Sequence, residues 1–99
     1  MKEQIFEWDE NKASSNYRKH GIKFEDAIEV FDDPYCIYQQ DRIVDGEYRW
    51  QAIGYTSDGI LLLLVAYTLR ERDNTEVIRI ISARQATRPE RKRYGNRTV

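Results

Sequence analysis

The sequence has few of the residues that build covalent or metal-held frameworks. Cys36 is its only cysteine, so an internal disulfide is impossible. It contains no Cys-x-x-Cys pair and no Cys/His spacing of a zinc site, so we expect no metal and no cofactor. Internal repeats and low-complexity linkers are also absent. Ninety-nine residues therefore predict one domain over residues 1–99, with one modest core.

Long apolar segments are missing as well. The longest run, Ile60 to Tyr67, is far shorter than the ~20 residues that a membrane-spanning helix needs. The first residues, Met1-Lys2-Glu3-Gln4, lead into charged sequence rather than into an apolar signal segment. We therefore expect a cytoplasmic protein in a reducing compartment, without membrane contact.

Charge is nearly balanced overall, at −1, but it is unevenly distributed. Residues 77–99 hold seven basic side chains and one acidic side chain, which is 7 − 1 = +6. Residues 1–76 hold nine basic and sixteen acidic side chains, which is 9 − 16 = −7. A local basic surface attracts an anionic polymer whatever the net charge is, so the C-terminal segment is the predicted functional surface. The alternative for Arg91, Lys92 and Arg93 is a solvated helix face.

The C-terminal segment reads as a strand that leads into a short helix. Residues Val77 to Ala83 are rich in β-branched side chains, which favour a strand. Thr87 and Glu90 have the spacing of a capping box, and Pro89 lies in the first turn, where its missing N–H costs nothing. We expect Gly95 to end the helix and the tail after it to fray.

The remaining elements follow from periodicity and turn residues. Asp9 is expected to cap a helix that ends near His20, before Gly21, and a second helix runs from Phe24 to the Asp33-Pro34 pair. The other predicted elements are strands at Ile5–Trp8, Tyr35–Gln40, Tyr48–Tyr55 and Ile60–Thr68, and a charged loop at Leu69–Glu76. Ile60–Thr68 is apolar on both faces, so it should be central.

This order predicts an α+β domain. A short N-terminal strand and two helices on one face of a four- to five-stranded, mainly antiparallel sheet are followed by a C-terminal helix. The second sheet face should be concave and polar, with Arg49 and Gln51 on one side of their strand and Trp50 and Ala52 on the other.

Several motifs occur in a characteristic order between residues 6 and 94. They are Phe6-Glu7-Trp8-Asp9, Lys12, Asn16, Lys19-His20-Gly21, Phe24-Glu25, Val30-Phe31-Asp32-Asp33-Pro34, Gly46-Glu47-Tyr48-Arg49, Ile53-Gly54, Ile78-Arg79-Ile80-Ile81-Ser82-Ala83-Arg84, Ala86-Thr87, Glu90-Arg91 and Tyr94. This set resembles the BrnT family, whose members are toxins of type II toxin–antitoxin pairs. The sequence departs from the family at Lys23, and in a longer connection over residues 69–76 that leaves the placement of Arg70 open.

The resemblance implies a RelE-like fold and a ribonuclease that inhibits translation and growth. It also implies a cognate BrnA-like antitoxin with a ribbon-helix-helix part, so that DNA is contacted only through the antitoxin. A toxin dimer within the complex is a further expectation. The alternative function is a non-catalytic adaptor that binds RNA or protein through the same basic surface.

Metal-independent RNA cleavage needs a base for the ribose 2′-OH, an acid for the 5′-oxygen and cations for the developing phosphorane charge. Arg79 and Arg84 are the predicted cations, because a strand and its exit hold them rigidly. Arg49 and Arg70 are expected to reach the same face, from a neighbouring strand and from the charged loop. His20, the only histidine, is the acid/base candidate, although capping or packing at a helix end is the alternative.

Further residues are predicted to bind RNA. Trp8 and Tyr94 are candidates for stacking on bases, with core packing as the alternative for each. The candidate phosphate ligands are basic side chains of the first and last helices: Lys12, Lys19, Arg88 and Arg91. The alternative for Lys12 and Lys19 is a solvated helix face.

Overall fold

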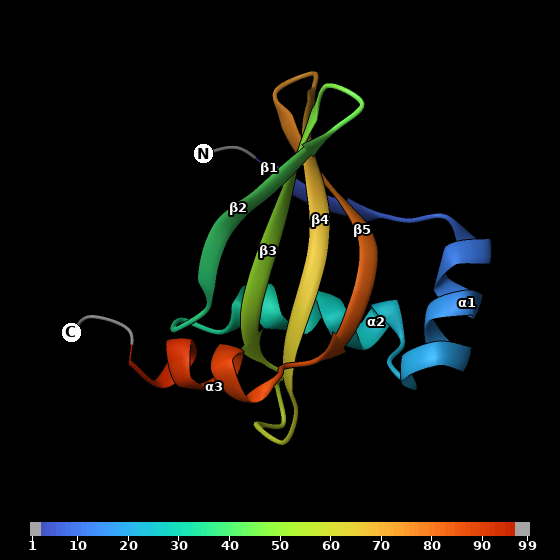
Figure 1. Ribbon diagram of the computed structural model, residues 1–99. Coiled ribbons are helices and arrows are strands. Elements are labelled where there is room, and N and C mark those ends of the chain that lie inside the picture. Colours follow the sequence, from blue (N-terminus) through green and yellow to red (C-terminus); the bar gives the residue numbers. More distant parts are fainter. Residues whose placement is uncertain (1–2, 97–99) are drawn as a thin grey trace.

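The computed structural model describes residues 3–96 and has an α+β architecture (Figure 1). The elements are β1 (Glu3–Glu7), α1 (Glu10–His20), α2 (Phe24–Ala27), the 3-10 helix η1 (Ile28–Asp32), β2 (Ile37–Val44), β3 (Glu47–Tyr55), β4 (Leu62–Arg72), β5 (Thr75–Gln85) and α3 (Arg88–Gly95). The five strands form one sheet in the order β1-β5-β4-β3-β2. β1 pairs with β5 in parallel, and the other pairs are antiparallel. The predicted fold class is therefore confirmed.

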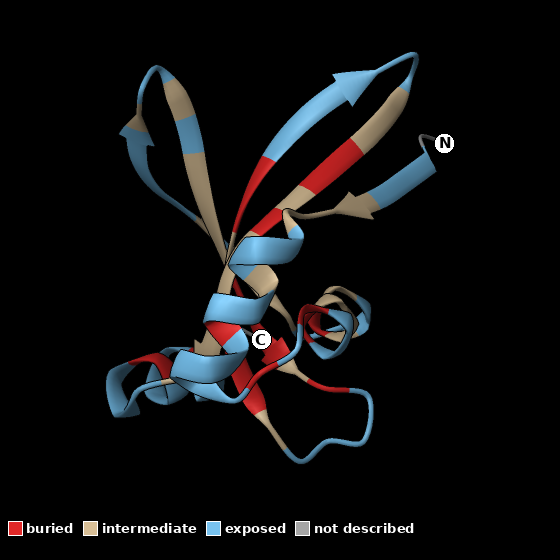
Figure 2. Ribbon diagram, turned by 90° about the vertical axis from the view of Figure 1, so that its right-hand side faces the viewer, coloured by how far each residue is buried: buried red, intermediate tan, exposed pale blue. Residues whose placement is uncertain are grey.

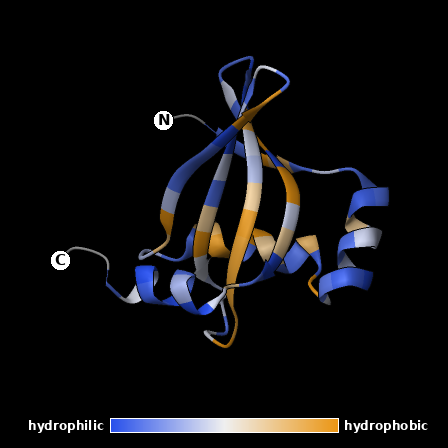
Figure 3. Ribbon diagram, in the orientation of Figure 1, coloured by the Kyte–Doolittle hydropathy of each residue, from blue (hydrophilic) through white to orange (hydrophobic). Residues whose placement is uncertain are grey.

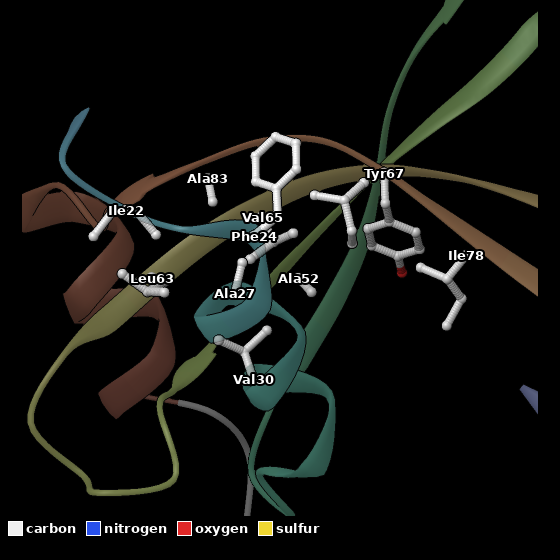
Figure 4. Close-up of a cluster of buried hydrophobic side chains, with 11 residues drawn as sticks. Ile22, Phe24, Ala27, Val30, Ala52, Leu63, Val65, Tyr67, Ile78 and Ala83 are labelled. Carbon is white, nitrogen blue, oxygen red and sulfur yellow. The ribbon is translucent and has the colours of Figure 1, made fainter. Parts of the chain in front are cut away.

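β4 is the middle strand, as its apolar sequence predicts. Its side chains alternate between two apolar clusters on opposite faces of the sheet, with Leu63, Val65 and Tyr67 in the larger cluster and Leu62 and Leu64 in the smaller one. The larger cluster lies under α2 and η1, where Phe24, Ala27 and Val30 complete it (Figure 4). The smaller cluster lies under α3, which covers only one end of its face (Figure 1).

The ends of the helices follow their local sequence. The Asp9 carboxylate accepts hydrogen bonds from the backbone N–H groups of Asn11 and Lys12, and Gly21 ends α1 in the left-handed conformation at φ 72°. Thr87 and Glu90 form the predicted capping box. Asn96, rather than Gly95, is the C-cap of α3. The predicted fraying of the tail concerns mainly residues 97–99. These residues, which include Arg97, lie outside the described part of the chain.

The second helix differs from the prediction in its geometry. It changes to a 3-10 helix at Ile28, and this tighter winding turns Val30 completely into the core. Phe31 is only partly buried and packs against Tyr67. The close approach of η1 to β3 requires Gly54, because a Cβ atom there would lie 3.0 Å from the carbonyl oxygen of Val30.

The prediction of a charged loop over residues 69–76 is wrong. Residues 69–72 continue β4, Thr75 and Glu76 begin β5, and a two-residue turn joins them. Asp73 and Asn74 have φ of 51° and 64°, as a type I′ hairpin turn requires. The charges did not prevent strand pairing because this end of the sheet is exposed, so charged side chains stay in water. Figures 2 and 3 show the exposure and the hydrophilic character of the end of the β4–β5 hairpin.

None of the helices within residues 3–96 is long and apolar enough to cross a membrane.

Candidate functional site: the polar face of the sheet

The sheet face that carries α3 is apolar beneath that helix and mainly polar beyond it, although the buried Val77 also lies there, opposite Arg70. Beyond it, polar side chains continue along the strands, since alternate residues of a strand share a face. We use the name polar face for this part of the sheet, which comprises the small apolar Ala66 and the polar residues Glu7, Glu47, Arg49, Gln51, Thr68, Arg70, Arg72, Arg79 and Ser82. Arg49 and Gln51 point to this face, and Trp50 and Ala52 point to the core on the other face, as predicted. The predicted polar sheet face is therefore present.

One row of the polar face crosses four strands. Thr68 pairs with Arg79, and Arg79 pairs with Glu7. Trp50 pairs with Tyr67, so the next step of the same antiparallel ladder places Arg49 beside Thr68. The row is thus Arg49–Thr68–Arg79–Glu7. Side chains in neighbouring positions of such a row have Cβ atoms about 4.5–5.5 Å apart, so two arginines flank one threonine.

Carboxylates hold most arginines of this face. Nη1 of Arg79 donates to Oε2 of Glu7 at 2.9 Å, and Nη2 of Arg72 lies 3.7 Å from the other oxygen of Glu7. Arg70 donates to Glu47 at 3.1 Å from β4 rather than from a loop, which corrects its predicted position. The Arg79 side chain is only 36% exposed and is therefore held in place more firmly than Arg70, which is 58% exposed.

Arg84 lies on the same side of the sheet but under α3. Its guanidinium donates to both oxygens of Glu90, at 2.7 and 2.9 Å. This bidentate pair, together with the N–H of Thr87, holds the pKa of the Glu90 carboxyl at about 2, well below its ordinary value of 4.5, and it raises the pKa of Arg84. Arg84 thus joins the end of β5 to the start of α3, and its predicted catalytic role stays a prediction.

α1 brings a second set of basic side chains to the edge of β5. Beyond the end of β1, the buried Asn16 side chain donates to the carbonyl oxygen of Ala83 at 2.9 Å and accepts from its N–H at 3.0 Å. This contact seats α1 beside Ser82. A shallow pocket of about 210 Å³ lies there, and its lining includes three predicted site residues: Lys12, Lys19 and His20.

The remaining predicted site residues divide between the core and the surface. Trp8 packs edge-on against Phe24 and belongs to the core of the helix-covered face. Tyr94 is 8% exposed, packs on Tyr55 and donates its hydroxyl to Asp33 at 2.7 Å. Both aromatic side chains thus make packing contacts, and their stacking on RNA bases stays a prediction. Two basic residues, Arg88 and Arg91, are exposed on α3.

Sequence reasoning missed three residues of this region: Glu7, Asn16 and Thr68. Each was assigned no role because its neighbours in the fold are distant in sequence; Asn16 and Ala83 are 67 positions apart. Only an expected pairing of β1 with β5 could have indicated Glu7.

Other chemistry has little support in the described residues. Burial raises the pKa of the Cys36 thiol to about 11, which disfavours the reactive thiolate. Within residues 3–96, no three His, Cys, Asp or Glu side chains gather as the ligands of a metal ion would.

The fold and this face define a small α+β protein with an arginine-lined sheet surface suited to an anionic polymer. A family model described as the ribonuclease toxin BrnT of type II toxin–antitoxin systems matches residues 8–90. Because the match spans most of the 99 residues, the chain belongs to the BrnT family of ribonuclease toxins. The family implies an antitoxin partner and an RNA target. No curated protein matches the chain.

Proposed function

We propose that the protein is an endoribonuclease that cuts RNA on its polar face without a metal ion. The ribose 2′-oxygen attacks the adjacent phosphorus, and the bond from phosphorus to the 5′-oxygen breaks. A base removes the 2′ proton, and an acid supplies a proton to the leaving 5′-oxygen. The products are a 2′,3′-cyclic phosphate end and a 5′-hydroxyl end.

The observation that carries this proposal is the row of two arginines beside the basic pocket of α1. Arg49 and Arg79 supply planar, permanently charged donors for the phosphorane oxygens. Ser82 lies in the pocket lining, three residues along β5 from Arg79, so the pocket and the row are adjacent. Lys12 and Lys19 then bind the phosphates of the continuing strand, and His20 is the candidate for proton transfer. We also propose that the protein acts on this RNA in the cytoplasm.

The test compares the rate of RNA cleavage by the Arg79→Ala variant with that of the wild type. The Arg18→Ala variant is the matched control. Arg18 is an exposed arginine of α1 that donates to Ser15 and lies outside the polar face. Loss of one preorganised cationic donor is expected to lower the cleavage rate about 10²–10³-fold. Thermal melts of each variant establish that the fold persists. If a folded Arg79→Ala variant cut RNA at the wild-type rate, the proposal that cleavage occurs on the polar face would be wrong.

The same cleavage assay tests the metal-independent mechanism. Wild-type protein in excess EDTA is expected to cut RNA and to leave the cyclic phosphate end. A strict requirement for magnesium would contradict the mechanism. Binding of RNA without any cleavage would instead favour the non-catalytic adaptor.

For the partner, we propose a BrnA-like ribbon-helix-helix antitoxin that covers the polar face and α3. The support is the charge of the C-terminal segment, +6 over residues 77–99, which an inhibitor must screen. DNA is then bound through the antitoxin.

A further inference from the structure

The polar face contains an unusual pair of unsatisfied atoms. Nε of Arg49 and Oγ1 of Thr68 are buried side-chain atoms for which residues 3–96 provide no hydrogen-bond partner. Thr68 is 2% exposed. Burying a polar group without a partner is unfavourable, so such groups in folded proteins call for an explanation. Here the two atoms belong to neighbouring residues of one cross-strand row.

The two atoms do not satisfy each other, although one is a donor and the other is both donor and acceptor. Their neighbours in the row are also informative. Arg79, on the far side of Thr68, uses Nη1 for Glu7, which leaves other N–H groups of its guanidinium for a second partner. The row therefore presents two guanidinium groups and one hydroxyl, all able to donate.

We infer that Arg49, Thr68 and Arg79 form a subsite for one phosphodiester group of single-stranded RNA. This inference rests on the proposed function and names the part of the site that binds the phosphate. A phosphodiester is a monoanion whose oxygens only accept hydrogen bonds, so it matches a set of donors. The Thr68 hydroxyl donates to it from the floor, and the two arginines donate from either side. The Arg49 side chain, which no carboxylate of the described residues holds, moves to admit the anion and uncovers the hydroxyl, while Arg79 stays paired with Glu7.

The arginines of this face differ in whether a carboxylate, Glu7 or Glu47, lies beside them. Arg70, Arg72 and Arg79 each lie within ion-pair distance of a carboxylate, and Arg49 has no such partner within the described residues. Partial burial of an arginine without a carboxylate partner lowers the stability of the fold, and a bound external anion offsets this loss. The geometry thus makes Arg49 the primary ligand, Arg79 the second and Thr68 the residue that aligns the phosphate between them.

The test uses Thr68→Val, which removes the hydroxyl and keeps the shape, and Thr68→Ser, which keeps the hydroxyl. Thr56→Val is the matched control: Thr56 is also buried, but its hydroxyl donates to Asp58 at 2.6 Å. The probe is a dye-labelled single-stranded 2′-deoxy oligonucleotide, which binds through its phosphates and cannot be cut by this mechanism. Affinity is measured by fluorescence anisotropy and stability by urea unfolding.

Thr68→Val is expected to be as stable as wild type or more stable, because it removes an unsatisfied buried group, and to bind the probe about 10–100-fold more weakly. Thr68→Ser should bind like wild type. Thr56→Val should be less stable and bind normally. Arg49→Lys should also bind more weakly, since it keeps the charge but loses the fork; it remains informative if a Thr68 variant fails to fold.

Unchanged binding by Thr68→Val, or no binding of the probe by the wild type, would overturn the subsite. Loss of stability in Thr68→Val with unchanged affinity would also overturn it, since the hydroxyl would then have a partner inside the protein. RNA cleavage is recorded in parallel. A wild type that binds the probe through Thr68 but cuts no RNA would refute the proposed function and leave the subsite standing.

Discussion

The ion pair between Arg84 and Glu90 offers a quantitative prediction, because it tests whether Arg84 stabilises the fold or, as the sequence predicts, acts in catalysis. The change is Glu90→Gln, which keeps the shape of the side chain and removes its charge. In the wild type, a pKa of about 2 for Glu90, against an ordinary 4.5, sets an upper limit of roughly 3.4 kcal/mol on the stabilisation. The Arg84 side chain is 35% exposed, so solvent screens part of this. We expect a loss of about 2 kcal/mol at pH 7.

The pH dependence follows from the direction of the shift. The pKa of Glu90 is lowered on folding, so the stabilisation is complete above pH 4.5 and is lost as the pH falls toward about 2. The difference in unfolding free energy between wild type and Glu90→Gln should therefore be largest at pH 7 and close to zero near pH 2. Comparing the two proteins at each pH cancels the contributions of the other carboxylates.

The assay is urea unfolding followed by circular dichroism at both pH values, with thermal melts at pH 7. For a domain of this size, about 2 kcal/mol corresponds to a fall in Tm of roughly 8–16 °C. Glu47→Gln is the matched control, because its ion pair with Arg70 is more exposed and should contribute less than about 1 kcal/mol. An equal effect of Glu90→Gln at both pH values, or none at pH 7, would refute the reasoning. A stable Arg84→Ala variant without nuclease activity would return Arg84 to a catalytic role.

Two further predictions concern Tyr94 and the antitoxin. Tyr94→Phe should lose about 1–2 kcal/mol of stability, because its hydroxyl donates to Asp33, and should cleave RNA at the wild-type rate per folded molecule; normal stability with reduced cleavage would indicate base stacking instead. Association with the antitoxin should slow as salt rises, since ions screen the basic segment. In surface plasmon resonance, alanine variants of the exposed Arg91, Lys92 and Arg93 should lower mainly the association rate, and Arg79→Ala should raise the dissociation rate. A rate indifferent to salt and to these variants would place the antitoxin elsewhere, on the acidic helices.

The sequence alone was sufficient wherever the controlling interactions are local. Asp9 and Gly21 mark the two ends of α1, and Thr87 and Glu90 mark the start of α3. The sequence predicts these ends because a helix cap involves residues within one turn of each other. The alternation of side chains around Trp50 assigned Arg49 to the polar face, because successive residues of a strand point to opposite faces. The apolar sequence of β4 placed it in the middle of the sheet, since a strand without a polar face must be covered on both sides.

The tertiary structure decided which side chains meet. Register between distant strands places Thr68 between Arg49 and Arg79, and no local pattern specifies that row. Arg84 and Glu90 were both evident in the sequence, yet only the path of the chain from β5 into α3 brings the guanidinium to the carboxylate. Side-chain chemistry is local, but a site depends on contacts between segments far apart in the chain, and these are set by the packing of the whole domain.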